Sequence, residues 1–188
     1  MYTNVQIINL GLTKIGSARI SRIDPPVSSL ERLCAEGYPQ WKRSELTKRR
    51  WVFATEDYYK LAQVDEVSGV ERPYKYALPV DCLRPVRQKR TEWKQRGKFI
   101  WSSCQDLRIS YIKNVEEKDL EALFVDVLAC RIAVECVEAI TQSNTKKADA
   151  ETLYQQAVNN AGQVNAFVIG PEDIQQDDDD FSFVNSRY

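Results

Sequence analysis

The amino-acid sequence predicts an α+β fold that is mainly α: a helical bundle with a small antiparallel β insertion between its second and third helical segments, and an extended C-terminal tail. Apolar residues recur at helical spacing in two stretches before residue 50 and in two more after residue 117. Between them, short runs of aromatic and β-branched residues replace this pattern. The chain has 188 residues, 43% of them hydrophobic, which suits one domain at 1–168 followed by an acidic tail at 169–188.

The expected elements follow from these patterns. The helices are predicted at about 4–16, 29–50, 118–142 and 145–164, and the β insertion at about 51–113. Two capping boxes, Thr3 with Gln6 and Ser28 with Glu31, mark the first two helix starts, because each pair of side chains can bond the other's backbone N–H. Gly16 is expected to end the first helix.

Proline and basic residues characterise the second helix. Pro39 predicts either a kink or a restart of the helix, since proline lacks the N–H that a helix interior requires. The exposed side of the segment that follows is expected to be basic. Its basic residues are Lys42, Arg43, Lys48, Arg49 and Arg50.

Short strands are expected within the insertion, as a small antiparallel sheet or as hairpins with one solvated face. Strand-like runs occur at 51–54, 58–61, 74–78, 83–86, 99–101 and 107–112. Residues 95–98, Gln-Arg-Gly-Lys, predict a turn between two strands.

The third helix is the segment around which the chain is expected to be organised. From residue 120 to 140 only five residues are charged, namely Glu121, Asp126, Arg131, Glu135 and Glu138. A membrane span needs about 20 apolar residues with few charges, so we expect this helix to be covered by protein. The fourth helix should pair with it as an antiparallel hairpin. The candidate subunit interface comprises Asp126, Arg131, Glu135 and Glu138, with Arg131 and Glu135 spaced for an ion pair.

Composition excludes several kinds of site. The chain has no histidine, which excludes His-based triads, two-histidine zinc sites and haem ligation by histidine. Its five cysteines lack metal-binding spacing, and we expect them to be small buried hydrophobes in a reducing compartment. No catalytic, cofactor-binding or metal-binding residue is predicted. The N-terminus lacks the features of a signal peptide, so synthesis and retention in the cytosol are expected.

Charge is distributed unevenly along the chain. Residues 1–113 hold 21 Lys/Arg and 12 Asp/Glu, whereas residues 114–188 hold 5 and 15, although the net charge is only −1. Such a split suits contact with nucleic acid or head-to-tail assembly, or else two solvated faces that merely differ.

Two segments are candidate contact surfaces. A basic stretch with interleaved Trp93, Phe99 and Trp101 is either a DNA-proximal or inter-ring surface or a charged edge that prevents sheet-to-sheet pairing. Its basic residues are Arg87, Lys89, Arg90, Lys94, Arg96 and Lys98. The acidic tail carries Phe181, Phe183 and Tyr188, and it either docks on a partner or stays disordered.

Three groups of motifs occur in a characteristic order. The first is 9–12 (Asn-Leu-Gly-Leu) with Ile15-Gly16, then 38–40 (Tyr-Pro-Gln) and 51–54 (Trp-Val-Phe-Ala). The second is 76–79 (Tyr-Ala-Leu-Pro), 81–84 (Asp-Cys-Leu-Arg), 97–100 (Gly-Lys-Phe-Ile) and 107–112 (Leu-Arg-Ile-Ser-Tyr-Ile). The third is the helix at 124–141 with its hairpin partner. Over residues 4–165 the chain resembles the phage head-to-tail adaptor, or connector, of the tail tubular protein A type from short-tailed phages.

The resemblance implies a non-enzymatic structural protein of the virion, located at the head–tail junction after synthesis in the host cytoplasm. It implies a homo-oligomeric ring, commonly of twelve subunits, seated under the portal protein and carrying the tail nozzle protein. Double-stranded DNA would pass through its channel without sequence-specific contact, and no membrane or cofactor is involved. The family fold is a helical bundle with a β insertion.

Two other functions remain open. One is a DNA-binding module that uses the basic β insertion. The other is a tail-associated polysaccharide hydrolase, which without histidine would need two carboxylates about 5 to 9.5 Å apart. The adjacent acidic pairs Glu56-Asp57, Asp65-Glu66 and Glu116-Glu117 are the only suggestion of such a site, and neighbours in sequence usually face different ways.

Overall fold

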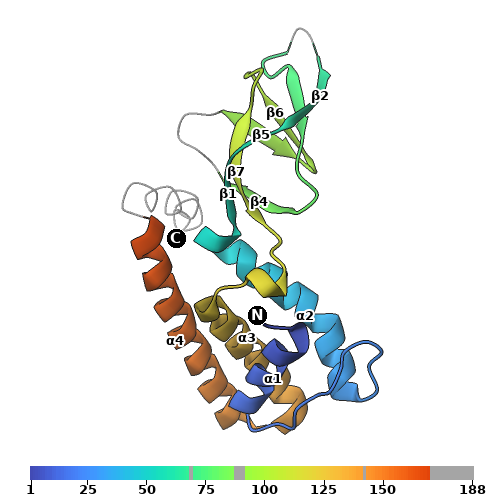
Figure 1. The fold of residues 1–188 in the computed structure, drawn as a ribbon, viewed down its shortest axis with the longest axis vertical. Helices are drawn as coiled ribbons and strands as arrows, with labels where there is room; N and C mark the ends of the chain where they lie inside the picture. The colour runs from blue at the N-terminus through green and yellow to red at the C-terminus, as the bar shows by residue number, and fades with distance from the viewer. Residues whose placement is uncertain (68–69, 87–91, 142, 170–188) are drawn as a thin grey trace. The chain divides into compact units, whose positions relative to one another are not determined.

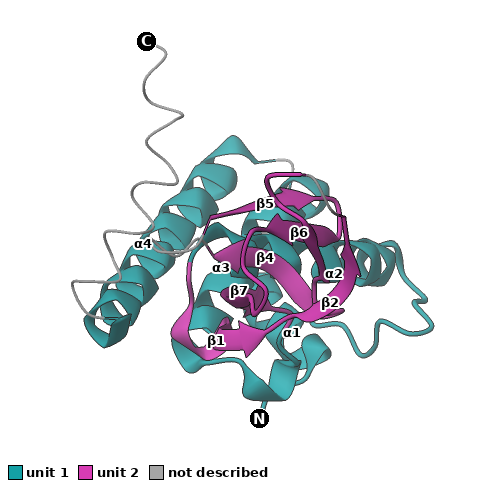
Figure 2. Cartoon of the chain, turned by 90° about the horizontal axis from the view of Figure 1, so that it is seen from above, with its two compact units in different colours: residues 1–49, 115–170 teal, residues 50–114, 171–188 magenta. Residues whose placement is uncertain are grey.

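The predicted fold class is confirmed. A computed structural model of the protein describes residues 1–67, 70–86, 92–141 and 143–169, and within them it contains four α-helices and two small antiparallel sheets (Figure 1). The described chain forms two compact units (Figure 2). The helical unit comprises residues 1–49 and 115–169, and the β unit comprises residues 50–114. This division is finer than the single domain at 1–168 that the sequence predicts.

The helices lie close to their predicted positions. They are α1 (Asn4–Lys14), α2 (Ser29–Lys48), α3 (Ala122–Thr141) and α4 (Asn144–Ile169). A short 3₁₀ helix, η2 (Glu117–Asp119), precedes α3, so the central helix begins four residues later than the predicted start at 118. The fourth helix continues five residues beyond its predicted end at 164.

The start and end signals of α1 act as predicted. The Thr3 hydroxyl accepts from the Gln6 N–H, and the Gln6 side chain accepts from the Thr3 N–H, which completes the capping box. At the other end Gly16 has φ +70°, and the N–H of Ser17 donates to the Leu12 carbonyl at 3.0 Å. This left-handed glycine satisfies carbonyls that the helix end would otherwise leave unpaired.

Pro39 does not restart the second helix, because α2 is one continuous helix with Pro39 inside it. The side chains on either side of the proline are held in the core: Tyr38 is 3% exposed and Trp41 is 8% exposed. A Cβ on Gly37 would lie 2.2 Å from the Trp41 ring, so the indole packs directly on the glycine backbone. Burial of these rings offsets the hydrogen bond that Pro39 cannot make.

The basic exposed side predicted for α2 is partly wrong. Lys42 is buried, and its ammonium donates to the Val115 carbonyl at 3.0 Å and to the Glu117 carboxylate at 2.8 Å. Burial alone would raise the pKa of Glu117, but hydrogen bonds and the charge of Lys42, led by the bond from Lys42, together outweigh burial and hold that pKa below its ordinary value. Lys42 therefore holds residues 115–117, the first residues of the helical unit after the β unit, against α2.

The core of the helical unit is built around α3, which packs against α1, α2 and α4. Its buried side chains are Phe124, Val125, Val127, Leu128, Ala129, Cys130, Ile132, Ala133, Cys136 and Val137. At Gly11 of α1 an added Cβ would lie 2.6 Å from the Ala129 carbonyl oxygen, so the glycine permits close contact between the two helices. The chain itself thus covers most of this apolar helix.

The β unit contains two sheets with strand orders β1-β7-β4 and β2-β3-β6-β5. The strands are β1 (Thr55–Lys60), β2 (Ala62–Glu66), β3 (Tyr74–Ala77), β4 (Cys82–Val86), β5 (Trp93–Arg96), β6 (Phe99–Ser102) and β7 (Arg108–Lys113). The strand predicted at 51–54 is wrong, because Val52–Ala54 forms the 3₁₀ helix η1. The Thr55 hydroxyl donates to the Trp51 carbonyl and closes this turn.

One apolar cluster holds the β unit together. Its buried members are Leu61, Tyr76, Ile100, Leu107, Ile109 and Tyr111. The Tyr76 hydroxyl donates to the Cys104 carbonyl at 2.6 Å, which satisfies its polar end. Residues 95–98 form the predicted turn, since Arg96 pairs with Phe99 and Gly97 has φ +60°. This tight hairpin fixes which side chains of β5 and β6 share a face.

Glu31→Gln should destabilise the helical unit at neutral pH. Backbone N–H groups of Val27 and Ser28 donate to the Glu31 carboxylate and hold its pKa below the ordinary value of 4.5. A carboxyl group with a lowered folded-state pKa stabilises the fold above its unfolded pKa and loses this effect as pH falls through the folded value. The stability difference from wild type should therefore shrink below about pH 4.5. Urea unfolding monitored by circular dichroism measures it.

Glu36→Gln, at an exposed position of the same helix, is the matched control and should show no pH-dependent difference from wild type. A deficit of Glu31→Gln that is equal at neutral and acidic pH would contradict this role of the carboxylate.

Candidate functional site

The four charges predicted as a subunit interface are bonded within the helical unit. Asp126 lies 2.8 Å from the Lys14 ammonium, and Glu138 lies 2.9 Å from that of Lys147. Arg131 pairs with Glu135 one turn along α3, as their spacing predicts. Each charge therefore has a partner in its own chain.

Arg131 also belongs to a charged cluster centred on Glu45 of α2. The Glu45 side chain is 2% exposed, and the Lys48 ammonium donates to it at 2.6 Å. The Tyr154 hydroxyl of α4 lies 3.1 and 3.0 Å from its two oxygens, and Arg131 Nε lies 3.9 Å from Oε1. The cluster joins three helices. Burying a charged carboxylate costs free energy unless hydrogen bonds and opposite charges, such as those around Glu45, replace its lost hydration.

The Glu45 cluster favours the protonated form of Lys48. Burial alone would lower the pKa of Lys48, but its hydrogen bonds to Glu45 and Tyr154 outweigh this effect and raise the pKa. Lys48 is thus fixed as a cation. Its charge and that of Arg131 both lie near the Tyr154 ring, at 5.3 and 5.9 Å from the centroid. These bonds give the cluster a structural role, and Glu45 was not predicted because nothing in the sequence distinguishes it from the exposed Glu36.

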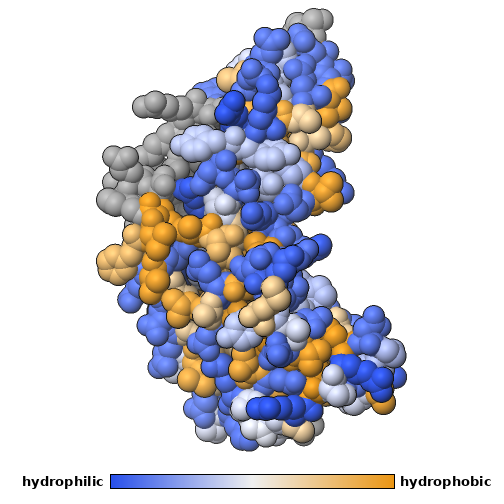
Figure 3. Space-filling view, in the orientation of Figure 1, coloured by the Kyte–Doolittle hydropathy of each residue, from blue (hydrophilic) through white to orange (hydrophobic). Residues whose placement is uncertain are grey.

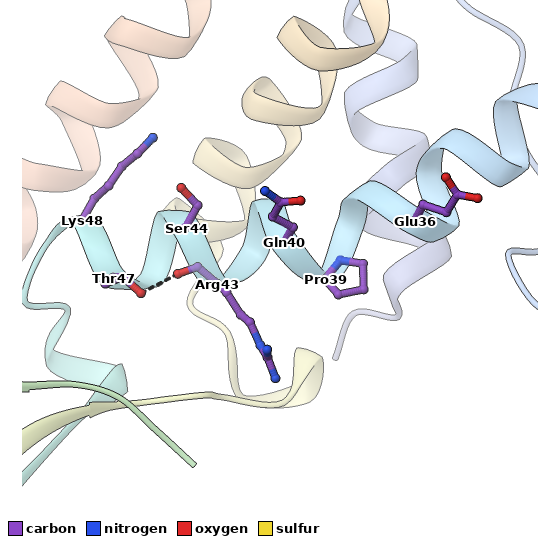
Figure 4. Close-up of a pocket in the computed structure, with 7 residues that line it drawn as sticks. All are labelled: Glu36, Pro39, Gln40, Arg43, Ser44, Thr47 and Lys48. Carbon is purple, nitrogen blue, oxygen red and sulfur yellow. Dashed lines mark hydrogen bonds between the residues drawn. The ribbon is translucent and has the colours of Figure 1, made fainter. Parts of the chain in front are cut away.

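A shallow pocket of about 650 Å³ runs along the exposed side of α2 (Figure 4). It is lined by Glu36, Pro39, Gln40, Arg43, Ser44, Thr47 and Lys48. The Thr47 hydroxyl donates to the Arg43 carbonyl and so is used within the helix. Arg43 and Lys48 are the exposed members of the predicted basic surface, and Figure 4 shows their side chains pointing in opposite directions from α2.

The basic segment of the β unit is divided by the hairpin. Successive residues of β5 point to opposite faces, so Trp93 packs against the apolar cluster while Lys94 and Arg96 lie on the other face. Lys94 pairs directly with Trp101 of β6, and Trp101 pairs with Lys75 of β3. Predicted residues Arg87, Lys89 and Arg90 lie outside the described residues.

We define the basic–aromatic face as Lys75, Lys94, Arg96, Phe99 and Trp101. Phe99 and Trp101 are half-buried, and the Lys75 ammonium lies 4.2 Å from the Phe99 ring centroid and 5.6 Å from that of Trp101. Cations and rings thus alternate across three strands of one sheet. Lys98, the remaining predicted residue, is exposed in the turn and lines a separate pocket.

Apolar side chains are exposed at the end of α4. Val164 is 50% exposed, Phe167 87% and Val168 65%. We call these three residues the α4 end stripe. Figure 3 shows hydrophobic side chains gathered over the C-terminal part of α4. An exposed apolar patch of this kind is a candidate docking surface for another segment or molecule.

Four of the acidic residues named as hydrolase candidates are in ion pairs, and Asp65 and Glu66 are exposed on β2. Glu56 pairs with Lys113 at 3.0 Å, and Asp57 pairs with Arg50 at 3.2 Å. Glu116 and Glu117 are paired with Lys118 and Lys42. Among the residues that the structure describes, no group of three or more Cys, Asp or Glu could hold a metal ion. The predicted tail residues Phe181, Phe183 and Tyr188 lie outside the described residues.

No family model matches the sequence, and no curated protein matches it significantly. Within the described residues, no helix is long and apolar enough to cross a membrane. The candidate sites therefore rest on the contacts, distances and exposure of their residues.

Glu45→Ala should lower the free energy of unfolding by about 1.5–3 kcal/mol, because it removes hydrogen bonds from charged and phenolic donors on two helices. Lys48 and Arg131 remain partly exposed and can turn to water, which limits the loss. Urea unfolding followed at 222 nm measures the change. Glu36→Ala, on the exposed side of the same helix, should stay within about 0.5 kcal/mol of wild type. Equal stability of the two variants would contradict the structural role of the cluster.

Proposed function

We propose that this protein is a structural head-to-tail adaptor of a short-tailed phage and forms a ring between the portal and the tail nozzle. The fold order supports the proposal: two helices, a β insertion, then a long apolar helix and its hairpin partner. This is the arrangement expected of the adaptor family that the sequence resembles. In this proposal the protein acts at the head–tail junction of the virion, and duplex DNA passes through the ring.

The motifs that carry the resemblance have defined places in the fold. The Asn9 amide donates to the Ile20 carbonyl at 2.9 Å and accepts from the Ile20 N–H at 2.8 Å, so it holds the loop after α1 against that helix. Gly11, two residues later, permits contact with α3. Residues 76–79 and 97–100 contribute to paired strands β3 and β6. The resemblance therefore rests on residues that shape the fold.

The observation that carries the proposal is the α4 end stripe. With 26 residues against 20, α4 is about 9 Å longer than α3 at the usual rise per residue. Figure 1 shows its C-terminal end extending past the start of α3. Ala157 and Ala161 are buried, and Val164 and Val168 continue their spacing beyond the partner helix. A second copy covering this apolar overhang would make a contact that can repeat around a ring.

Charge supports assembly through the β unit. The helical unit is nearly neutral: residues 1–49 and 115–170 hold 12 Lys/Arg and 13 Asp/Glu. Residues 50–114 hold 13 and 8, and residues 171–188 hold 1 and 6. The charge split of the sequence therefore separates the β insertion from the C-terminal segment. Opposite charges of this kind favour a heterologous contact between different surfaces of neighbouring copies.

Replacing the α4 end stripe with serine should prevent ring formation while the subunit remains folded. Val164, Phe167 and Val168 are half or more exposed in one copy, so their loss removes little intrachain packing. Multi-angle light scattering should give a multi-subunit mass for the wild type, alone or with portal protein. The Val164→Ser, Phe167→Ser, Val168→Ser variant should give the mass of one chain, 21.7 kDa.

Asn159→Ser and Gln163→Ser, at exposed polar positions of the same helix, form the matched control and should assemble like the wild type. Particle images with portal protein should show a second coaxial ring for the wild type and for this control. A wild-type protein that stays monomeric and ignores portal at every concentration would overturn the proposal.

A further inference from the structure

A second pocket lies on the β unit beside the basic–aromatic face. It has a volume of about 330 Å³ and is lined by Val67, Val70, Glu71, Arg72, Lys94, Arg96 and Trp101. Val67 and Val70 are 38% and 50% exposed, so the pocket combines an apolar wall with the Trp101 ring. Three cations border the same space. A pocket of this composition suits a ligand that carries both carboxylates and apolar groups.

The three cations of the pocket differ in whether a carboxylate of the protein already pairs with them. Arg72 is paired with Glu71 at 3.0 Å and approaches Glu92 at 3.8 Å. Lys94 and Arg96 are exposed, and within the part of the chain that the structure describes neither is paired with a carboxylate. Two neighbouring cations without counter-ions can bind an added acidic group with little competition from the protein itself.

The position of β5 in its sheet offers a second kind of contact for a peptide. In the strand order β2-β3-β6-β5, β5 (Trp93–Arg96) is an edge strand that pairs with β6 on one side. An extended peptide can add to such an edge through main-chain hydrogen bonds, while its alternate side chains enter pockets on one face. Duplex DNA offers phosphates to the cations, but its apolar groups are mainly thymine methyls in the groove and bases stacked inside the helix, which suit the pocket of Val67, Val70 and Trp101 less well than a free aromatic side chain does.

We propose that the basic–aromatic face and its pocket bind the C-terminal segment of the protein itself, residues 177–184. This segment reads Asp-Asp-Asp-Asp-Phe-Ser-Phe-Val. Its aspartates match Lys94 and Arg96, and Phe181 and Phe183 alternate so that both rings meet one face of a sheet. Residues 171–188 carry a balance of −5 and residues 50–114 one of +5, from 1 and 13 Lys/Arg against 6 and 8 Asp/Glu.

Hydrogen–deuterium exchange on the full chain tests the proposal. Amides of residues 177–184 should exchange at least about tenfold more slowly than in the same sequence as a free peptide. The double variant Lys94→Glu, Arg96→Glu should lose this protection, because it replaces attraction with repulsion. The matched control Arg43→Glu, Lys146→Glu changes charge equally at exposed positions of the helical unit and should keep it. Both variants must retain the wild-type circular dichroism spectrum.

Carbodiimide coupling locates the segment directly. In wild type, Asp177 to Asp180 should cross-link to Lys75 or Lys94, and mixing isotope-labelled with unlabelled protein shows whether the two ends come from one copy or two. Either result supports the proposal, which does not depend on ring formation. Unprotected tail amides in wild type, or cross-links only to lysines elsewhere, would overturn it. So would salt-sensitive binding of duplex DNA that needs Lys94 and Arg96 and is unchanged when the four aspartates become asparagine.

Discussion

The burial of α3 is the constraint on which the helical unit depends. A helix this apolar must be covered on nearly every side, and α1, α2 and α4 provide the cover. Its few charges lie at the margins of the core, and three of them meet three different helices. The pairs are Asp126–Lys14 with α1, Arg131–Glu45 with α2 and Glu138–Lys147 with α4. The Asp126–Lys14 and Glu138–Lys147 pairs are partly exposed and add little stability. The Arg131–Glu45 pair involves a buried carboxylate, and all three pairs favour one arrangement of helices over others.

Local signals in the sequence predicted the helices well, and signals that depend on distant partners did not. The capping boxes at Thr3 and Ser28 involve neighbouring residues only, so they could be recognised without the fold. The strand β2 was missed because it is short and fully exposed, and its alternation of Ala62 and Val64 with Gln63 and Asp65 is too brief to distinguish a strand from a loop. Lys42 was expected at the surface, since its partners Val115 and Glu117 follow more than 70 residues later.

The candidate sites, too, could be predicted only where neighbouring residues in the sequence define them. Period-two alternation separates Trp93 from Lys94 and Arg96, and the turn at 95–98 was predicted, so part of the basic–aromatic face was accessible from the sequence. The contribution of Lys75 was not, because it depends on the pairing of β3 with β6. Likewise, the charges of α3 suggested an external interface, whereas their partners on three other helices became known only from the packing.

Because its own chain covers α3, the surface available for assembly lies on α4. A strongly apolar central helix is accounted for by its own chain and does not require a second subunit. The end of α4 is different, because the inward spacing of Ala157 and Ala161 continues into Val164 and Val168, beyond the start of the antiparallel helix α3. A helix that kept apolar residues at solvated positions without a partner would expose a surface prone to association. The sequence thus extends the pattern of a buried helix beyond the start of α3, and the described residues leave Val164 and Val168 at least half exposed. The proposed contact with a second copy would cover them.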